Sequence, residues 1–172
     1  MNALIYSKQI KVEAEEILES TKLLKILQEH GDVRVGGSFA MDLMYDPDID
    51  LTIACENPAK SAIQFLNTVI QKQLFQKYQY GDFENHPREG RPKDHIIVLI
   101  LPYKERVWEI EIWFKHGHNK EQIVLEKKIM QLPQEVKEGI IQRKADRELE
   151  GLDKHTLSSY EIYQEALSNL IG

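Results

Sequence analysis

The sequence predicts an α/β protein of the α+β kind, with a mixed sheet flanked by helices and a C-terminal helical extension. Short β-forming runs alternate with helical spacing over the first two thirds of the chain. Two of these runs, 95–101 and 107–114, form an antiparallel pair by their pattern, and beyond Asn119 the spacing is helical throughout. The 172 residues suit a chain of about one domain. We expect a core domain over 1–118 and a helical extension over 119–172 packed on it.

The first elements alternate between helix and strand. Apolar residues spaced by three and four predict a helix from about Gln9 to Leu27, and Gly31 is expected to end it in a left-handed conformation. A short strand follows at 33–35, and a second at 49–54. Asn57 and Pro58 are typical of a helix start, and the helix is expected to continue to about Phe75.

The later elements include the pair of β-forming runs and the helical extension. We predict a strand at 78–84 and a loop at 85–94, because that segment holds two prolines and a glycine. After the antiparallel pair, three helical stretches carry the rest of the chain. The charged run 143–150 alternates in sign and is interpreted as a solvated helix face.

Composition restricts the classes of partner and the compartment. Lys and Arg number 22 and Asp and Glu number 28, a formal charge of −6, which makes binding to a nucleic-acid backbone unfavourable. The one cysteine, Cys55, forms no internal disulfide and fits a reducing compartment. No run approaches the roughly 20 apolar residues of a membrane span, and the start of the sequence lacks a signal-peptide pattern. We expect a soluble cytoplasmic protein with no membrane partner.

The residues with the clearest chemistry are Gly36, Gly37 and Ser38, followed after nine intervening residues by Asp48 and Asp50. Glycines at a strand end before a helical turn let backbone amides approach a phosphate, and the serine adds a hydroxyl donor. Alternation along a strand places both aspartates on one face, where their repulsion favours a bound cation. Carboxylate oxygens suit Mg²⁺, which completes its shell with water and phosphate. Together, these residue types favour metal-assisted nucleotidyl transfer.

The string VGGS, a short spacer and a D-x-D between apolar residues resemble the signature of the DNA polymerase beta-like nucleotidyltransferases. The longer run GGSFAMDLMYDPDIDLTI is similar to the lincosamide and aminoglycoside nucleotidyltransferases, including the Asp42 that follows the glycine pair. The resemblance covers about residues 33–114 and matches the last third of the chain only loosely. It implies that Gly36, Gly37 and Ser38 bind the triphosphate and that Asp48 and Asp50 hold two Mg²⁺ ions.

The same resemblance implies a third acidic residue on a later strand, which binds metal or accepts the proton of the attacking hydroxyl. The strand at 107–114 offers Glu109 and Glu111, both opposite the apolar positions. We favour Glu111, because it lies mid-strand between apolar neighbours. The segment 39–45 lacks the basic residue of smaller relatives, so Arg91, Lys93 or Lys115 is expected to reach the phosphates. Asp42 either caps the glycine turn or contacts substrate.

Other conspicuous residues have simpler interpretations. His116 and His118 are interpreted as a surface loop rather than a zinc site, because no further ligand completes the set. Trp108 and Trp113 are interpreted as core and rim packing, and Tyr160 and Tyr163 as packing between helices. Cys55 is interpreted as a thiol that nothing activates.

We therefore expect a metal-dependent nucleotidyltransferase that moves a nucleoside monophosphate from a nucleoside triphosphate such as ATP to a hydroxyl, releasing pyrophosphate. A small hydroxylated molecule is the expected acceptor, an antibiotic being one such molecule, and a nucleic acid is not expected. Two alternatives remain: a transferase that modifies a protein partner of the toxin–antitoxin type, and a non-catalytic module that binds nucleotide or metal. Whether a homodimer completes the pocket stays open.

Overall fold

A computed structural model describes residues 2–154 and 156–169 of the chain, which falls into two compact units. The sheet unit comprises Ala14–Gly36 and Pro47–Asn119, and the helical unit comprises Met1–Glu13, Gly37–Asp46 and Lys120–Gly172. The chain passes from one unit to the other inside its first helix and again between the two glycines of the VGGS string. The domain boundary expected after His118 stays a prediction, since the contacts also assign two earlier segments to the helical unit.

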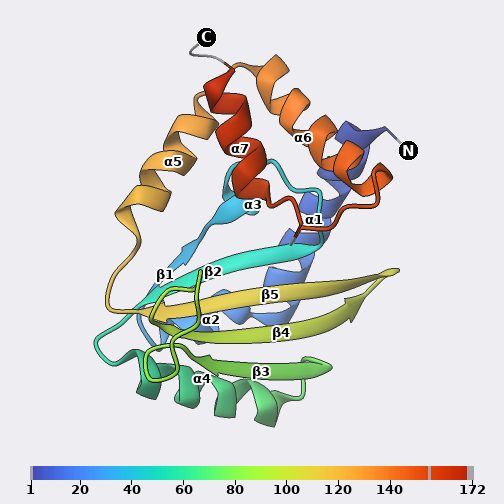
Figure 1. Ribbon diagram of the computed structural model, residues 1–172. Helices are drawn as coiled ribbons and strands as arrows, with labels where there is room; N and C mark the ends of the chain where they lie inside the picture. Colours follow the sequence, from blue (N-terminus) through green and yellow to red (C-terminus); the bar gives the residue numbers. More distant parts are fainter. Residues whose placement is uncertain (1, 155, 170–172) are drawn as a thin grey trace. The chain divides into compact units, whose positions relative to one another are not determined.

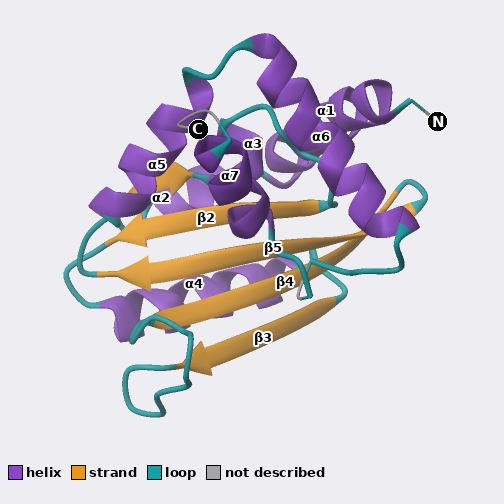
Figure 2. Ribbon diagram, turned by 45° about the horizontal axis from the view of Figure 1, so that its top comes forward, coloured by secondary structure: helices purple, strands orange, loops and turns teal. Residues whose placement is uncertain are grey.

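The sheet unit holds a five-stranded mixed sheet in the order β1-β2-β5-β4-β3 (Figure 2). β2 and β5 are parallel, and each other neighbouring pair is antiparallel. The strands are β1 (Asp32–Val35), β2 (Asp48–Ala54), β3 (Lys77–Asp82), β4 (His95–Tyr103) and β5 (Arg106–Lys115). The predicted α+β class with a mixed sheet is confirmed.

One side of this sheet forms the core of the unit. The alternating apolar residues of β2 and β5 are at most 1% exposed: Ile49, Leu51, Ile53, Trp108, Ile110, Ile112 and Phe114. Helix α2 (Leu23–Gln28) contacts β1, and α4 (Pro58–Lys72) contacts β3, β4 and β5 along the same side (Figure 1). As expected from the sequence, the side chain of Asn57 caps α4 by accepting a hydrogen bond of 3.0 Å from the Lys60 amide.

The helical unit is built from short segments that are distant in sequence. It contains the first part of α1 (Ala3–Thr21), α3 (Gly37–Ala40), α5 (Lys120–Met130), α6 (Gln134–Leu149) and α7 (Ser159–Ser168). Its core is formed by residues of α1, α5, α6 and α7 together with the segment that follows α3. Among these residues are Ala3, Met41, Leu43, Ile129, Ile140 and Ile162. Ser158 and Glu161 form a capping box that fixes the start of α7.

Three boundaries differ from the sequence prediction. The first helix starts at Ala3 rather than near Gln9, and it breaks at Lys22, which has a φ of 55°. The fourth helix ends at Lys72 rather than Phe75. Gly31 is not a left-handed helix cap, because the helix before it already ends at Gln28. In the described residues, no helix is both long enough and apolar enough to cross a membrane.

Candidate functional site

The acidic residues predicted from the sequence lie on the side of the sheet opposite α2 and α4. In the parallel register Asp48 is paired with Glu109, and Asp50 is paired with Glu111. Adjacent strands are about 4.8 Å apart, so each aspartate lies beside a glutamate of the neighbouring strand. All four side chains are half-buried, whereas the residues between them along each strand point into the core. The register therefore brings together two pairs of carboxylates on one face.

Backbone hydrogen bonds fix this face at both ends of the carboxylate pairs. The amide of Gly36 donates to the carbonyl of Asp50 at 2.9 Å, which holds the end of β1 beside the second pair. The amide of Glu109 donates to the carbonyl of Pro47 at 3.0 Å and extends the parallel ladder by one residue. The first glycine of the VGGS string is thus held against the backbone of a predicted metal ligand.

The carboxylate face has the chemistry of a magnesium site but does not form a closed cage. In the part of the chain that the structure describes, no group of three or more His, Cys, Asp or Glu side chains converges as a metal cage. Mg²⁺ needs no such cage, because it is held through one or two carboxylates and takes its other ligands from water and substrate phosphates. The carboxylate pairs therefore fit a metal that binds together with a nucleotide.

Arg34 on β1 is one of the basic residues on this face of the sheet. It is paired with Thr52, the next residue after Asp50 on the same side of β2. Burial lowers the pKa of the Arg34 guanidinium, although an arginine remains charged at physiological pH. Its charge partly balances the acidic residues on the neighbouring strands.

Gly37 and Ser38, the second half of the VGGS string, belong to the helical unit and have partners there. Gly37 has a φ of 62°, which favours glycine, and its amide donates to Oε1 of Glu126 at 2.9 Å. The hydroxyl of Ser38 lies 2.8 Å from that of Tyr163 and accepts a hydrogen bond of 2.9 Å from Lys144. Both predicted phosphate donors are therefore engaged with side chains of the C-terminal helices.

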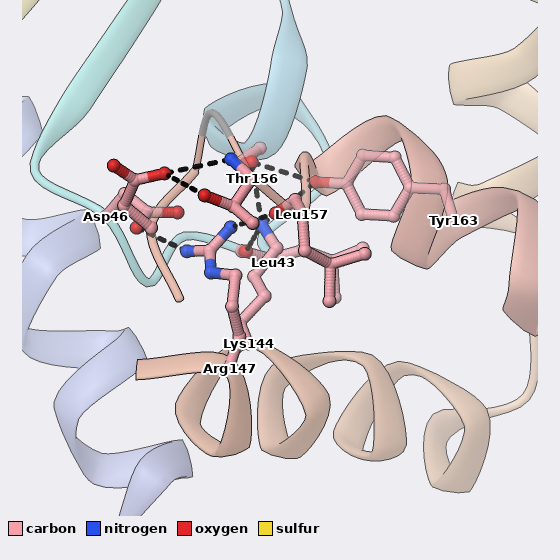
Figure 3. A network of polar contacts seen from close by, with 9 residues as sticks. Leu43, Asp46, Lys144, Arg147, Thr156, Leu157 and Tyr163 are labelled. Atoms are coloured by element: carbon pink, nitrogen blue, oxygen red, sulfur yellow. Dashed lines mark hydrogen bonds and ion pairs between the residues drawn. The ribbon is translucent and has the colours of Figure 1, made fainter. Parts of the chain in front are cut away.

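Lys144 is a buried partner of Ser38 that the sequence analysis does not single out. Its side chain is fully buried, and Nζ donates to Ser38, to the carbonyl of Leu43 and to the hydroxyl of Tyr163 at 2.8–3.0 Å. Figure 3 shows Lys144 reaching from α6 toward Leu43. A buried ammonium group therefore lies against the serine hydroxyl of the VGGS string.

The run 143–150 is not the solvated face that its alternating charges predict. Arg147, one turn after Lys144, is 2% exposed and donates hydrogen bonds to Asp46 and to the carbonyl of Leu157 (Figure 3). The two buried basic residues lie three positions apart, which is helical spacing. That spacing within a charged run is the available signal, and the acidic residues that alternate with the basic ones in 143–150 mask it.

The remaining candidates lie outside the carboxylate pairs or at the edge of their face. Lys115 forms an ion pair with Asp94 at 3.0 Å, and His118 contacts Asp32 at the same distance. Trp108 is core, as predicted, whereas Trp113 is half-buried on the carboxylate face. Arg91 and Lys93 are exposed in the loop between β3 and β4. Burial raises the pKa of the Cys55 thiol.

Comparison with solved structures identifies the fold. The chain is similar to the Cid1 poly(U) polymerase with Mg and 3′-dATP bound, at a TM-score of 0.61 and 18% identity, over 95% of this chain and 52% of that one. It is also similar to the polymerase core of the RNA surveillance complex TRAMP, at a TM-score of 0.60 and 18% identity, over 87% and 46%. A cytoplasmic RNA terminal U-transferase matches with a TM-score of 0.57 and 19% identity, over 88% and 45%.

The fold is of the nucleotidyltransferase type. The chain spans about half the length of the structures it matches. No protein-family model matches the sequence, and no curated protein matches it significantly. The nucleotidyltransferase fold expected from the resemblance is confirmed, while the specific similarity to lincosamide and aminoglycoside enzymes stays a prediction.

Proposed function

We propose that this chain transfers a nucleoside monophosphate from a nucleoside triphosphate to a hydroxyl group and releases pyrophosphate. The observation that carries the proposal is the β2–β5 register, which sets Asp48 and Asp50 beside Glu109 and Glu111 on a face not used by the core. Four acidic side chains on one face of a folded domain concentrate negative charge there, which favours the binding of cations. The nucleotidyltransferase-type fold supports the same reading.

Asp48, Asp50 and Glu111 are the proposed ligands of Mg²⁺. Bound there, the metal would lower the pKa of the attacking hydroxyl and neutralise charge on the leaving pyrophosphate. Carboxylates on two adjacent parallel strands are spaced for sharing cations, and their half-buried setting strengthens the attraction relative to bulk water. Glu111 is also the proposed base that accepts the proton of the hydroxyl.

Gly36, Gly37 and Ser38 are the proposed triphosphate-binding turn, with Lys144 as its cation. The amide of Gly37 and the hydroxyl of Ser38 are donors of the kind that bind phosphate oxygens. The ammonium group of Lys144 already contacts the Ser38 hydroxyl at 2.9 Å, so a phosphate bound to the serine would also meet a positive charge. These residues hold the nucleotide while the acceptor oxygen bonds to its α-phosphorus and the bond to the bridging oxygen breaks.

The 3′-hydroxyl of an RNA strand is the proposed acceptor. Support comes from the solved structures of similar fold, which are a poly(U) polymerase, the polymerase core of an RNA surveillance complex and an RNA terminal U-transferase. A small hydroxylated acceptor, expected from the sequence, has no such support. The net charge of −6 excludes neither acceptor, because a strand end bound at one site needs few phosphate contacts.

Titration with Mg-ATP and Mg-UTP and measurement of pyrophosphate release test this proposal together. Wild-type protein should bind a Mg–nucleotide and release pyrophosphate with a single-stranded RNA, whereas aminoglycosides, lincosamides and polyols should not substitute for it. Asp50→Asn should reduce release by more than about 100-fold, the upper range for groups that merely orient metal ligands. Asp32→Asn removes the same charge from an exposed end of the sheet and should leave release unchanged. Failure to bind any Mg–nucleotide would refute the proposal.

A non-catalytic nucleotide-binding module is the second candidate. The observation behind it is that protein side chains engage the Gly37 amide and the Ser38 hydroxyl, so the turn is not set for the in-line transfer of a bound triphosphate. Binding of Mg–nucleotide without pyrophosphate release for any acceptor would identify this case. The same titration therefore separates the two candidates.

A further inference from the structure

The strand register places a row of residues directly beside the Asp50–Glu111 pair on the same face of the sheet. From β1 to β3 this row consists of Arg34, Thr52, Trp113, Ile96 and Gly81, each paired with the next. We call it the Trp113 row. Residues two apart on a strand are about 6.6 Å apart, so Trp113 is the next residue after Glu111 on this face, about 6.6 Å along β5.

The indole of Trp113 has a cation and a second aromatic ring beside it. Lys115 Nζ lies 5.1 Å from the centroid of the Trp113 ring and pairs with Asp94 at 3.0 Å, which fixes the ammonium group in place. The ring of Phe83 lies 6.1 Å away, tilted by 36°. Trp113 is half-buried, in contrast to the fully buried Trp108 on the core side of the same strand.

A glycine at the end of the row makes room for this aromatic pair. A Cβ on Gly81 would lie 2.8 Å from Cγ2 of Ile96 and 3.3 Å from the ring of Phe83. A side chain at residue 81 would therefore press on Ile96 and on the Phe83 ring that lies beside Trp113. The amide of Phe83 donates to the carbonyl of Asp94 at 3.0 Å and closes the loop between them.

That loop places exposed charged side chains next to the aromatic pair, and the segment 83–94 holds three basic and three acidic residues. Arg88, Arg91 and Lys93 are exposed in the segment between β3 and β4, which begins at Phe83 and ends at Asp94, the partner of Lys115. Aromatic rings for bases and basic side chains for the backbone are the combination by which proteins bind single-stranded nucleic acid.

We propose that the Trp113 row binds the 3′-terminal nucleotide of a single-stranded RNA acceptor, with the terminal base stacked on Trp113 and its backbone near Lys115 and the loop. This inference rests on the proposed function and names the acceptor-binding residues of the same site. It assigns the row to the acceptor rather than to the incoming nucleotide because Gly36 is held on the β1 side of Asp50, whereas Trp113 lies on β5, beyond Glu111. The triphosphate and the acceptor base then approach the carboxylates from different strands.

The test combines variants of Trp113 with an RNA whose 3′-terminal nucleotide lacks its base. Stacking of one base on an aromatic side chain corresponds to about a 5- to 150-fold change in affinity. Trp113→Leu should raise the KM for the RNA by that factor and leave the KM for the nucleotide unchanged, and Trp113→Phe should restore most of the loss. Wild type should lose the same factor on the abasic RNA, whereas Trp113→Leu should bind both RNAs equally.

A binding measurement without turnover provides an independent readout. RNA should quench the intrinsic fluorescence of the wild type and of Ile63→Ala, a control on the exposed side of α4. It should not quench the fluorescence that remains in Trp113→Phe. An unchanged acceptor KM in Trp113→Leu, an effect on the nucleotide KM instead, or turnover with small acceptors alone would overturn the inference while the proposed transfer stands. If the wild type bound no Mg–nucleotide, that result would instead refute the proposed function.

Discussion

The amide of Gly37 donates a hydrogen bond of 2.9 Å to the carboxylate of Glu126, a residue of α5 that is only 3% exposed. Gln122, one turn earlier, donates to the same carboxylate oxygen at 3.1 Å. An anionic oxygen at the amide of a glycine turn has the charge and the hydrogen-bonding role of a phosphate oxygen. If Gly37 binds the triphosphate, the nucleotide must take this donor from Glu126.

Glu126→Gln is therefore expected to strengthen the binding of Mg-ATP. The amide oxygen of glutamine is a weaker competitor for the Gly37 amide, and its neutral group no longer repels phosphate. A hydrogen bond to a charged group contributes about 1.5 kcal/mol or more, so the Kd should fall by about tenfold in a calorimetric titration. Glu121→Gln, which removes a charge from an exposed position of the same helix, should have little effect. Weaker binding by Glu126→Gln would mean that Glu126 supports the turn instead.

Much of the sheet could be predicted from the sequence because each strand carries its own period. Residues 48–54 and 107–114 alternate between apolar and polar types, and that alternation decides which side of the sheet each residue occupies. The break of the first helix at Lys22 has no comparable local signal, since a lysine adopts a left-handed conformation only under tertiary constraint. The sequence favours Gly31 as a helix cap, whereas the structure places it against the distant carbonyl of Ala54.

The carboxylate pairs were also predictable, because Asp48, Asp50 and Glu111 follow from alternation within two strands. Their register could not be predicted, since the strands are separated by a helix and a hairpin that carry no information on pairing. Lys144 and Glu126 were missed for a related reason. Each contacts the VGGS string from a helix about ninety or more residues later, and no local pattern reports such a contact.

Gly31→Ala should destabilise the sheet unit. A Cβ at this position would lie 2.4 Å from the carbonyl oxygen of Ala54 and 2.9 Å from Cγ2 of Ile53, so β2 would have to shift. Overpacking of this kind costs about 1–3 kcal/mol, which urea unfolding measures directly. Gly117→Ala is the matched control, because a Cβ there meets nothing within 4 Å. Equal midpoints for the two variants would contradict the close approach.

His30 should make the fold sensitive to mild acid. Burial lowers the pKa of the His30 imidazole, partly offset by Glu29, and its buried Nε2 has no hydrogen-bond partner in the described residues. As pH falls through the ordinary value of about 6.5 toward the lowered folded-state pKa, the unfolded chain binds the proton first, so the free energy of unfolding decreases. Urea unfolding at pH 7.5 and 5.5 should show a smaller decrease for His30→Gln than for wild type. Identical decreases would exclude this contribution.

Glu111 and Glu109 provide the sharpest comparison within the site, because they occupy consecutive positions on the same face of β5 with equivalent partners on β2. Glu111 is paired with Asp50, whose backbone carbonyl accepts a hydrogen bond from Gly36, so one strand separates Glu111 from the first residue of the proposed phosphate turn. Glu109 is paired with Asp48 one step farther away. Glu111→Gln should therefore reduce pyrophosphate release by more than about 100-fold, because glutamine neither binds metal as an anion nor accepts the proton of the hydroxyl. Glu109→Gln should retain most activity. Rates measured against pH for both variants decide the matter, and a larger loss in Glu109→Gln would transfer the proposed role to that residue.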